Sequence, residues 1–327
     1  MTGRNYLYTF LQSVWLRNRE LLKITNETEL TAISWQLQNL LKMIISIIGV
    51  GLLGGSFALG LKKKYPHIKF IGVDNSVVNQ KIALAKGIVD EITSLEDALQ
   101  IAELNVLATP VDVITTLLPY MLDNIPAGRT IMDLGSTKEQ ICQLVDNHLN
   151  RGQFVAVHPM SGIENSGPGA AFKELLVNKN VIICDKERSY TDSLGLVEVF
   201  LRDVGMKIHY MTPVEHDLHL AYVSHLSHIS SFALGLTVLD KEKDEKAIFD
   251  MASTGFSSTV RLAKSSPQMW APIFDQNKTN VSKALGDYIE LLKKFKDAID
   301  NKDLDTSLSF MNRANDIGRI LAGIEKK

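Results

Sequence analysis

Residues Met43–Ser56, MIISIIGVGLLGGS, are the most informative part of this chain for its fold. A run of apolar, mostly β-branched residues leads into a G-x-G-x-x-G pattern at Gly49, Gly51 and Gly54. This order predicts a buried strand, a tight turn and the start of a helix. A second strand-like run ends in an acid, Asp74, which lies 20 residues after Gly54. Strand, glycine turn, helix, strand and acid at this spacing are typical of a dinucleotide-binding site.

Each glycine of the pattern has a physical reason. Gly49 permits the tight turn, Gly51 leaves room for a pyrophosphate, and Gly54 lets the helix pack closely on the strand. Free N–H groups at the helix start attract phosphate. The Asp74 carboxylate accepts hydrogen bonds from a ribose and repels a 2′-phosphate, which favours NAD over NADP. The predicted cofactor-binding residues are Gly49, Gly51, Leu52, Leu53, Gly54 and Asp74, together with Thr109 and Pro110 at the end of a later strand.

Composition narrows the class of protein. The 327 residues, 45% hydrophobic and 22% charged, predict a soluble protein of about two domains. Met43–Leu61 lacks charge and has the hydropathy of a membrane span, but five glycines interrupt it, so we expect no membrane association. The net charge of −2 gives no general attraction to nucleic acid. Cys142 and Cys184 form no motif, which predicts free thiols in a reducing compartment, the cytoplasm.

From Met43 to residue 211, strand patterns alternate with helix patterns. This alternation predicts an α/β fold, a Rossmann-type doubly wound sheet with mostly parallel strands, over residues 43–211. The expected strands cover residues 43–48, 68–73, 104–108, 130–133, 154–157, 181–184 and 206–210. A helix is expected to open near Gly135, with Ser136 or Thr137 as its N-cap.

The pattern changes after Tyr210, where only helices are expected. Residues 212–327 therefore predict an all-helical domain that binds substrate and forms a homodimer. Its expected helices cover residues 214–239, 244–253, 257–264, 267–275, 278–299 and 303–324. Residues 1–42 fit neither pattern, so we interpret them as an N-terminal extension. Either Met43 is the natural start, or the extension packs as a helix.

Two residues that follow strands are candidates for chemistry. Ser136 and His158 are expected at the carboxyl edge of the sheet, where ligands bind in open α/β sheets. A histidine there is well placed for proton transfer, but a histidine that caps a loop has the same pattern. Arg261 lies in an apolar helix start and needs an anion, either a protein carboxylate or a substrate carboxylate. The sequence leaves both choices open.

The helical part carries a group of histidines. His216 and His219, and His225 and His228, lie three residues apart, a spacing at which two histidines can share a metal. No Asp, Glu or Cys completes a ligand set at a fixed spacing. We therefore expect no metal site, but hydrogen bonds to substrate for some histidines and structural hydrogen bonds for the others.

Together these residues resemble the prephenate dehydrogenase family of tyrosine biosynthesis. The similarity rests on IIGVGLLGGS at 47–56, DLGSTK at 133–138, HPMSGIENSG at 158–167, HxxxVSHLSHISSFAL at 219–234 and RLAKSSPQMWAPIF at 261–274. It covers almost all of Met43–Lys327. The resemblance implies NAD-dependent oxidative decarboxylation of prephenate to 4-hydroxyphenylpyruvate, by a Rossmann domain followed by a helical dimerisation domain.

The resemblance also implies roles for single residues. His158 corresponds to the catalytic histidine that bonds the substrate 4-hydroxyl, Ser136 to its partner, and Arg261 to the arginine that holds a substrate carboxylate. Residues expected to line or gate the substrate pocket are Glu164, Ser224, His228, Trp270 and His216. Arogenate dehydrogenase and a non-catalytic NAD-responsive binding protein are the alternatives. His228 in the pocket favours prephenate over arogenate.

Overall fold

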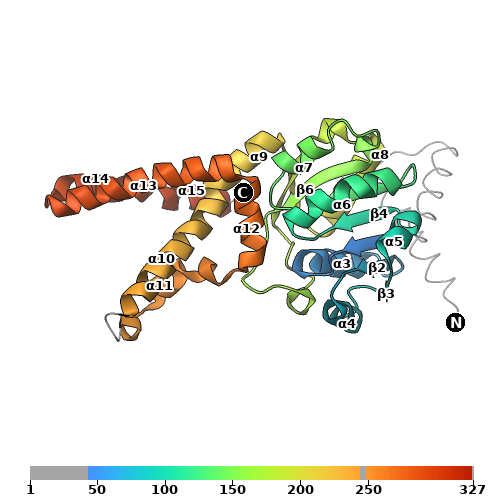
Figure 1. Ribbon diagram of the computed structural model, residues 1–327, viewed down its shortest axis with the longest axis horizontal. Coiled ribbons are helices and arrows are strands. Elements are labelled where there is room, and N and C mark those ends of the chain that lie inside the picture. Colours follow the sequence, from blue (N-terminus) through green and yellow to red (C-terminus); the bar gives the residue numbers. More distant parts are fainter. Residues whose placement is uncertain (1–42, 244–247, 326–327) are drawn as a thin grey trace, which may run out of the picture.

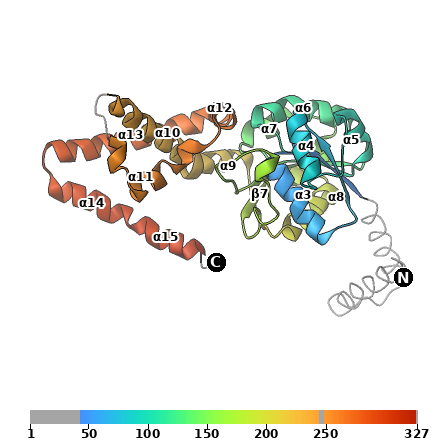
Figure 2. The same ribbon diagram turned by 90° about the horizontal axis from the view of Figure 1, so that it is seen from below.

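The computed structural model describes residues 43–243 and 248–325. The proposed N-terminal extension, residues 1–42, and residues 244–247 of the helix expected over 244–253 lie outside the described residues. The rest of the chain forms a sheet half followed by a helical half (Figures 1 and 2).

Eight strands form one sheet in the order β3-β2-β1-β4-β5-β6-β7-β8. The strands are β1 (Ile44–Ile48), β2 (Lys69–Val73), β3 (Glu91–Ile92), β4 (Leu104–Leu107), β5 (Thr130–Asp133), β6 (Phe154–Pro159), β7 (Asn180–Cys184) and β8 (Lys207–Met211). Strands β1 to β6 are parallel, β7 runs antiparallel to β6, and β8 is parallel to β7. The expected doubly wound, mostly parallel sheet is confirmed. The short β3 and the reversal at β7 were not expected.

Strand β1 lies between β2 and β4, so the chain reverses its direction of travel across the sheet at β1. In open α/β sheets a ligand crevice forms at such a switch point, beyond the carboxyl ends of the strands. The glycine turn follows β1 at this edge, and Thr109 follows β4.

Helices cover both faces of the sheet. The helices of the sheet half are α3 (Leu52–Lys64), α4 (Val77–Ala85), α5 (Leu95–Ile101), α6 (Val111–Asn124), α7 (Glu139–Leu144) and α8 (Thr191–Asp203). Residues of α3, α4 and α8 share one hydrophobic core, and residues of α5, α6 and α7 share the other.

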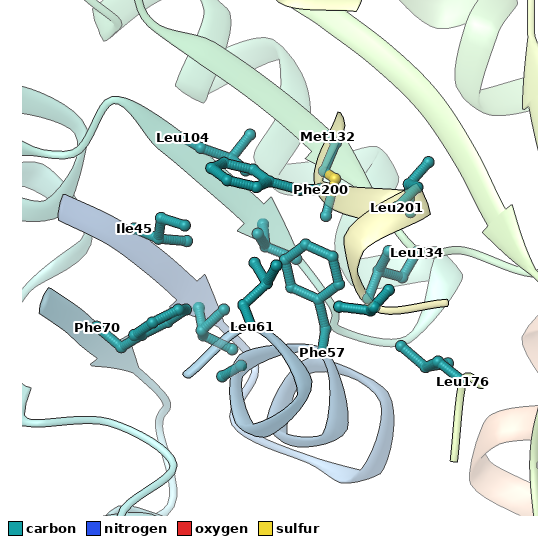
Figure 3. Close-up of a cluster of buried hydrophobic side chains, with 14 of the residues drawn as sticks. Ile45, Phe57, Leu61, Phe70, Leu104, Met132, Leu134, Leu176, Phe200 and Leu201 are labelled. Atoms are coloured by element: carbon teal, nitrogen blue, oxygen red, sulfur yellow. The ribbon is translucent and has the colours of Figure 1, made fainter. Parts of the chain in front are cut away.

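Helix α3 contributes two large side chains to the first core. Phe57 and Leu61, one helical turn apart, are fully buried beside Ile45 of β1 and Phe70 of β2 (Figure 3). Burial of each such side chain stabilises the fold by about 1.5–3 kcal/mol. The uncharged segment Met43–Leu61 is thus a strand, a turn and most of a helix. No helix in the described part of the chain is long and apolar enough to cross a membrane.

The helical half begins with a strong cap. The Thr212 hydroxyl accepts the Glu215 N–H, and the Glu215 carboxylate accepts the Thr212 N–H. The helices that follow are α9 (Pro213–Leu220), α10 (Leu226–Glu242), α11 (Thr254–Thr259), α12 (Pro267–Gln276), α13 (Lys278–Asp300), α14 (Leu304–Ala314) and α15 (Asp316–Glu325). In both views α13 and α14 extend away from the sheet (Figures 1 and 2).

Four expected helices differ in detail. The described part of the helix expected over 244–253 is a 3₁₀ turn, Ile248–Met251. The helix expected over 214–239 contains a π-helical turn, Ala221–His225, between α9 and α10. The helix expected over 257–264 is the end of α11 and a 3₁₀ turn, Arg261–Lys264. The helix expected over 303–324 is divided into α14 and α15.

Candidate active site

The glycine turn after β1 has the geometry of a phosphate cradle. Gly49 has a φ of +89°, and a Cβ there would lie 2.7 Å from the Ala108 carbonyl oxygen. A Cβ at Gly54 would lie 2.6 Å from the Gly49 carbonyl oxygen, so both positions require glycine. A Cβ at Gly51, the N-cap of α3, would meet no atom within 4 Å. The space beside Gly51 therefore suits a bound phosphate group rather than a packing partner.

Asp74 follows β2 and points back toward this turn. Its carboxylate accepts the N–H of Val50 (3.2 Å) and of Ser76 (2.9 Å), and the side-chain amide of Asn79 (3.3 Å). These bonds hold an acid beside the glycine turn, where a ribose of a dinucleotide lies in Rossmann folds.

A cleft of about 540 Å³ lies between the carboxyl edge of the sheet and helices α10 and α12. The predicted residues on its wall are Leu52, Leu53, Thr109, Pro110, Ser136, His158, Glu164, Ser224, His228, Arg261 and Trp270. Ser136 is half-buried on the wall, in the turn after β5. The structure thus gathers residues from both halves of the chain around one cleft whose volume suits a small-molecule site.

His158 lies near the end of β6, and its ring is held from behind. His158 Nδ1 lies 2.8 Å from Nε2 of His216, and His216 Nδ1 lies 2.7 Å from Oδ1 of Asp217. All three side chains are more than nine-tenths buried. Because Nδ1 is engaged by His216, Nε2 is the ring nitrogen that His158 presents to the cleft.

Burial keeps these histidines neutral. Burial, and then the neighbouring His216, Lys138 and His225, hold the pKa of His158 well below its usual range. Burial also lowers the pKa of His216, against the opposing effect of Asp217. A neutral histidine has one unprotonated ring nitrogen, so His158 is able to accept a proton at neutral pH.

Two expectations need correction here. His216 was expected on the pocket wall, but it is fully buried behind His158. Neither Ser136 nor Thr137 caps α7. Instead, the Asp217 carboxylate accepts the N–H of Lys138 (2.8 Å) and that of the next residue (3.0 Å). A distant acid has taken the place of the local cap.

Arg261 meets a protein carboxylate. Its guanidinium lies 2.5 Å from the Glu164 carboxylate, and the Arg261 side chain is 55% exposed. The hydrogen bond from Arg261 lowers the pKa of Glu164. These two are the only fully charged side chains among the described residues that line the cleft. An ion pair as exposed as this one is weak, so a substrate carboxylate can compete for Arg261.

Aromatic rings close the side of the cleft formed by the helical half. His228 stacks on Trp270 with ring centroids 3.6 Å apart, and its Nδ1 lies 3.0 Å from the Ser224 carbonyl oxygen. A carbonyl only accepts, so Nδ1 carries the hydrogen and Nε2 is an acceptor. Burial lowers the pKa of His228, and the ring is neutral. An acceptor does not bond a keto oxygen, so in this tautomer His228 gives no preference for prephenate over arogenate.

Sequence reasoning gave His225 no specific role and did not select Asp217 or Asn277. His225 lines the cleft, and burial lowers its pKa to about 4. Asn277 donates to the Asp217 backbone carbonyl (2.7 Å) and contacts His225 Nδ1 (3.2 Å). Asp217 had no recognisable signal besides its position next to His216. Within the described residues, no group of three or more metal-binding side chains forms.

Comparison with known proteins gives a consistent result over both halves. Residues 57–210 match the family model described as prephenate dehydrogenase, nucleotide-binding domain. Residues 212–313 match the model described as prephenate dehydrogenase, dimerization domain.

Individual relatives span most of the chain. The prephenate dehydrogenase of Bacillus subtilis is 30% identical over 85% of this chain and 76% of its own length. The structure of prephenate dehydrogenase from A. aeolicus with hydroxyphenyl propionate and NAD+ is 30% identical, with a TM-score of 0.78 over 86% of this chain and 98% of that one. Synechocystis arogenate dehydrogenase is 27% identical, with a TM-score of 0.68 over 85% of this chain and 100% of its own.

Proposed function

The chain belongs to the prephenate dehydrogenase family, and on that premise we propose that it converts prephenate to 4-hydroxyphenylpyruvate with NAD. The observation that carries the proposal is the position of His158. A neutral histidine, with Nε2 as an acceptor, lies on the wall of the same cleft as Leu52 and Leu53, the first residues of α3 after the glycine turn. Residues 43–211 would bind NAD, and residues 212–327 would complete the substrate site.

The residues around the glycine turn support NAD as the cofactor. The space beside Gly51 and the N–H groups that begin α3 suit the pyrophosphate, and the Asp74 carboxylate suits a ribose. The negative charge of Asp74 disfavours the 2′-phosphate of NADP. NAD bound here supplies an acceptor for the hydride that leaves C4 of prephenate.

The protein's own groups manage the proton and the charges. His158 Nε2 accepts the 4-hydroxyl proton while C4 loses its hydride, and Ser136 on the same wall orients the hydroxyl. The ring carboxylate leaves as carbon dioxide, its bonding electrons complete the aromatic ring, and the resulting phenolate oxygen takes the proton back from His158. Arg261 releases Glu164 and holds a substrate carboxylate, which fixes the ring relative to His158.

Arogenate is the second candidate substrate, since it has an ammonium where prephenate has a keto group. Two acceptors in the cleft suit an ammonium, namely Nε2 of neutral His228 and the Glu164 carboxylate once Arg261 has turned to the substrate. The similarity to Synechocystis arogenate dehydrogenase supports the same candidate. The names of the family models and of the B. subtilis relative favour prephenate.

We also propose a homodimer formed through the helical half. Apolar side chains on its helices are exposed in the single chain, among them Leu236, Ile299, Leu304 and Ile320. Large apolar side chains that are exposed together are typical of an interaction surface. Analytical ultracentrifugation would show one species of twice the chain mass, and a monomer at micromolar concentration would contradict the proposal. Cytoplasmic location stays a prediction.

The function is tested by steady-state rates with four substrate pairs. Prephenate and arogenate are each assayed with NAD and with NADP, and the reduced cofactor is followed by absorbance. We expect the highest kcat/KM with prephenate and NAD. A higher kcat/KM with arogenate would assign the second candidate, and no turnover with any pair would contradict the enzyme function.

A further inference from the structure

We propose that Asp217, acting through His216, is a positioning residue that holds His158 in the tautomer able to accept the substrate's hydroxyl proton. This inference rests on the proposed function. Asp217 touches neither substrate nor cofactor, because it is 1% exposed and lies two hydrogen bonds from the nitrogen that faces the cleft.

The direction of the hydrogen bonds follows from the acceptors. The Asp217 carboxylate accepts two backbone N–H groups, from Lys138 and Glu139, and it faces His216 Nδ1 with the same Oδ1 that accepts from Lys138. A carboxylate in this role only accepts, so His216 Nδ1 carries a hydrogen. Neutral His216 then has a lone pair on Nε2.

The position of the hydrogen on the His158 ring follows in the same way. The lone pair on His216 Nε2 requires a donor at 2.8 Å, so His158 Nδ1 carries its hydrogen. The lone pair of neutral His158 is thereby placed on Nε2, toward the cleft. With the opposite tautomer, His158 would present an N–H to the substrate hydroxyl and would be unable to accept its proton.

The carboxylate itself is fixed from both halves of the chain. The side-chain oxygens of Asp217 accept N–H groups from the start of α7, in the sheet half. The backbone carbonyl of Asp217 accepts a hydrogen bond from Asn277 at the start of α13. His216 comes from α9 and His158 from β6. The tautomer of the base is therefore set only when the helical half is docked on the sheet half.

The first test is Asp217→Asn. The amide can offer an N–H where His216 now donates, which reverses the tautomers along the chain. An equivalent Asp→Asn change in Ser–His–Asp triads places the wrong tautomer and lowers kcat by about 10⁴-fold. We expect kcat with prephenate to fall by roughly 10²–10⁴-fold, with little change in either KM. Glu215→Gln is the matched control, because this acid caps α9 two residues away and its side chain bonds Thr212 rather than His158 or His216.

A second variant separates positioning from a structural role. His216→Leu removes the link to His158 but leaves the Asp217 bonds to α7 in place. We expect its kcat to fall as far as that of Asp217→Asn, with a smaller change in Tm. If Asp217→Asn loses activity and His216→Leu keeps it, Asp217 only holds the two halves together and the proposal is wrong. A wild-type kcat in Asp217→Asn would also overturn it.

A measurement without turnover keeps this inference apart from the proposed function. In ¹⁵N-histidine NMR of the full chain at pH 7.5, assigned with His158→Gln, wild-type His158 should be protonated on Nδ1 and unprotonated on Nε2. Asp217→Asn should shift His158 toward the opposite tautomer, and Glu215→Gln should not. If wild-type protein turned over no substrate, the proposed function would fail, yet this spectrum would still decide on the tautomer. An Nε2-protonated His158 in wild type would refute the inference.

Discussion

The Nδ1 atom of His158 lies 2.8 Å from the Nε2 atom of His216, and this contact joins strand β6 of the sheet to helix α9 of the helical half. The wall of the cleft is likewise formed by both halves. Leu52 and Thr109 come from the sheet half, and His228 and Trp270 come from the helical half. A site divided between two halves of a chain is complete only while they are docked.

Replacement of the base should affect turnover far more than binding. His158→Gln keeps a polar side chain of similar size but lacks the basic nitrogen, so kcat should fall by about 10²–10⁴-fold while KM changes little. Steady-state kinetics with prephenate measures both. His209→Gln, an exposed histidine of β8 that bonds only the Asn180 side chain, serves as control. Equal kcat in wild type and His158→Gln would remove His158 from the mechanism.

The cofactor site is tested by two glycines that differ in their surroundings. Gly51→Ala should fold with an unchanged Tm, because its Cβ meets no protein atom, but the KM for NAD should rise by roughly ten-fold or more as the methyl group enters the phosphate space. Gly54→Ala should lower Tm, because its Cβ would lie 2.6 Å from a backbone oxygen. Thermal unfolding and NAD titration give both quantities. If Gly51→Ala bound NAD as wild type does, the phosphate would have to lie elsewhere.

Removal of the cleft's cation should weaken substrate binding. Arg261→Gln loses a charge-assisted hydrogen bond to a substrate carboxylate, so KM for prephenate should rise by about 10–100-fold with kcat nearly unchanged. Glu164→Gln is the paired variant, since it frees Arg261 from its present partner and should not raise KM. A loss confined to kcat would instead make Arg261 a transition-state group.

The buried histidines predict a loss of stability in acid. The folded-state pKa of His225 is about 4, below its unfolded value near 6.5, so the unfolded chain binds the extra proton as the pH falls. The contribution of His225 to the free energy of unfolding is fully present above pH 6.5 and is lost as the pH falls toward 4. His225 alone should account for about 2 kcal/mol of unfolding free energy between pH 7 and pH 5. Burial also lowers the pKa of His158 and of His216, so these two histidines likewise make the fold less stable as the pH falls.

Urea unfolding at several pH values measures this slope. The His225→Gln variant lacks the titrating ring, so its free energy of unfolding should depend less steeply on pH than that of wild type. Identical slopes for the two proteins would show that His225 does not titrate as its burial requires.

The parts of the fold that sequence alone predicted are those with local causes. Gly49 and Gly54 stand where only glycine fits, and the strand patterns correctly placed Ser136 and His158 at one edge of the sheet. The role of Asp217 was out of reach, because its carboxylate binds N–H groups 78 and 79 residues earlier in the chain. No spacing rule covers such a contact.

The directions in which the histidines of the helical half point were also not predictable from the sequence. In a regular α-helix, His216 and His225 would point about 180° apart, since each residue turns the helix by about 100°. The π-helical turn Ala221–His225 lies between them and changes this relation; His225 lines the cleft, and His216 lies behind His158. Hydrophobic periodicity gives no sign of such a turn. The partner of Arg261 was also left open, because Glu164 lies 97 residues away.

The stoichiometry of one reaction tests directly whether this protein oxidises and decarboxylates prephenate. Purified full-length protein is given prephenate and excess NAD, and reduced NAD, carbon dioxide and 4-hydroxyphenylpyruvate are measured over the same time course. We predict equal amounts of all three products, and their near-complete loss with His158→Gln. Wild-type protein that formed reduced NAD without carbon dioxide, or that formed none of the three products, would show that this cleft does not oxidise and decarboxylate prephenate.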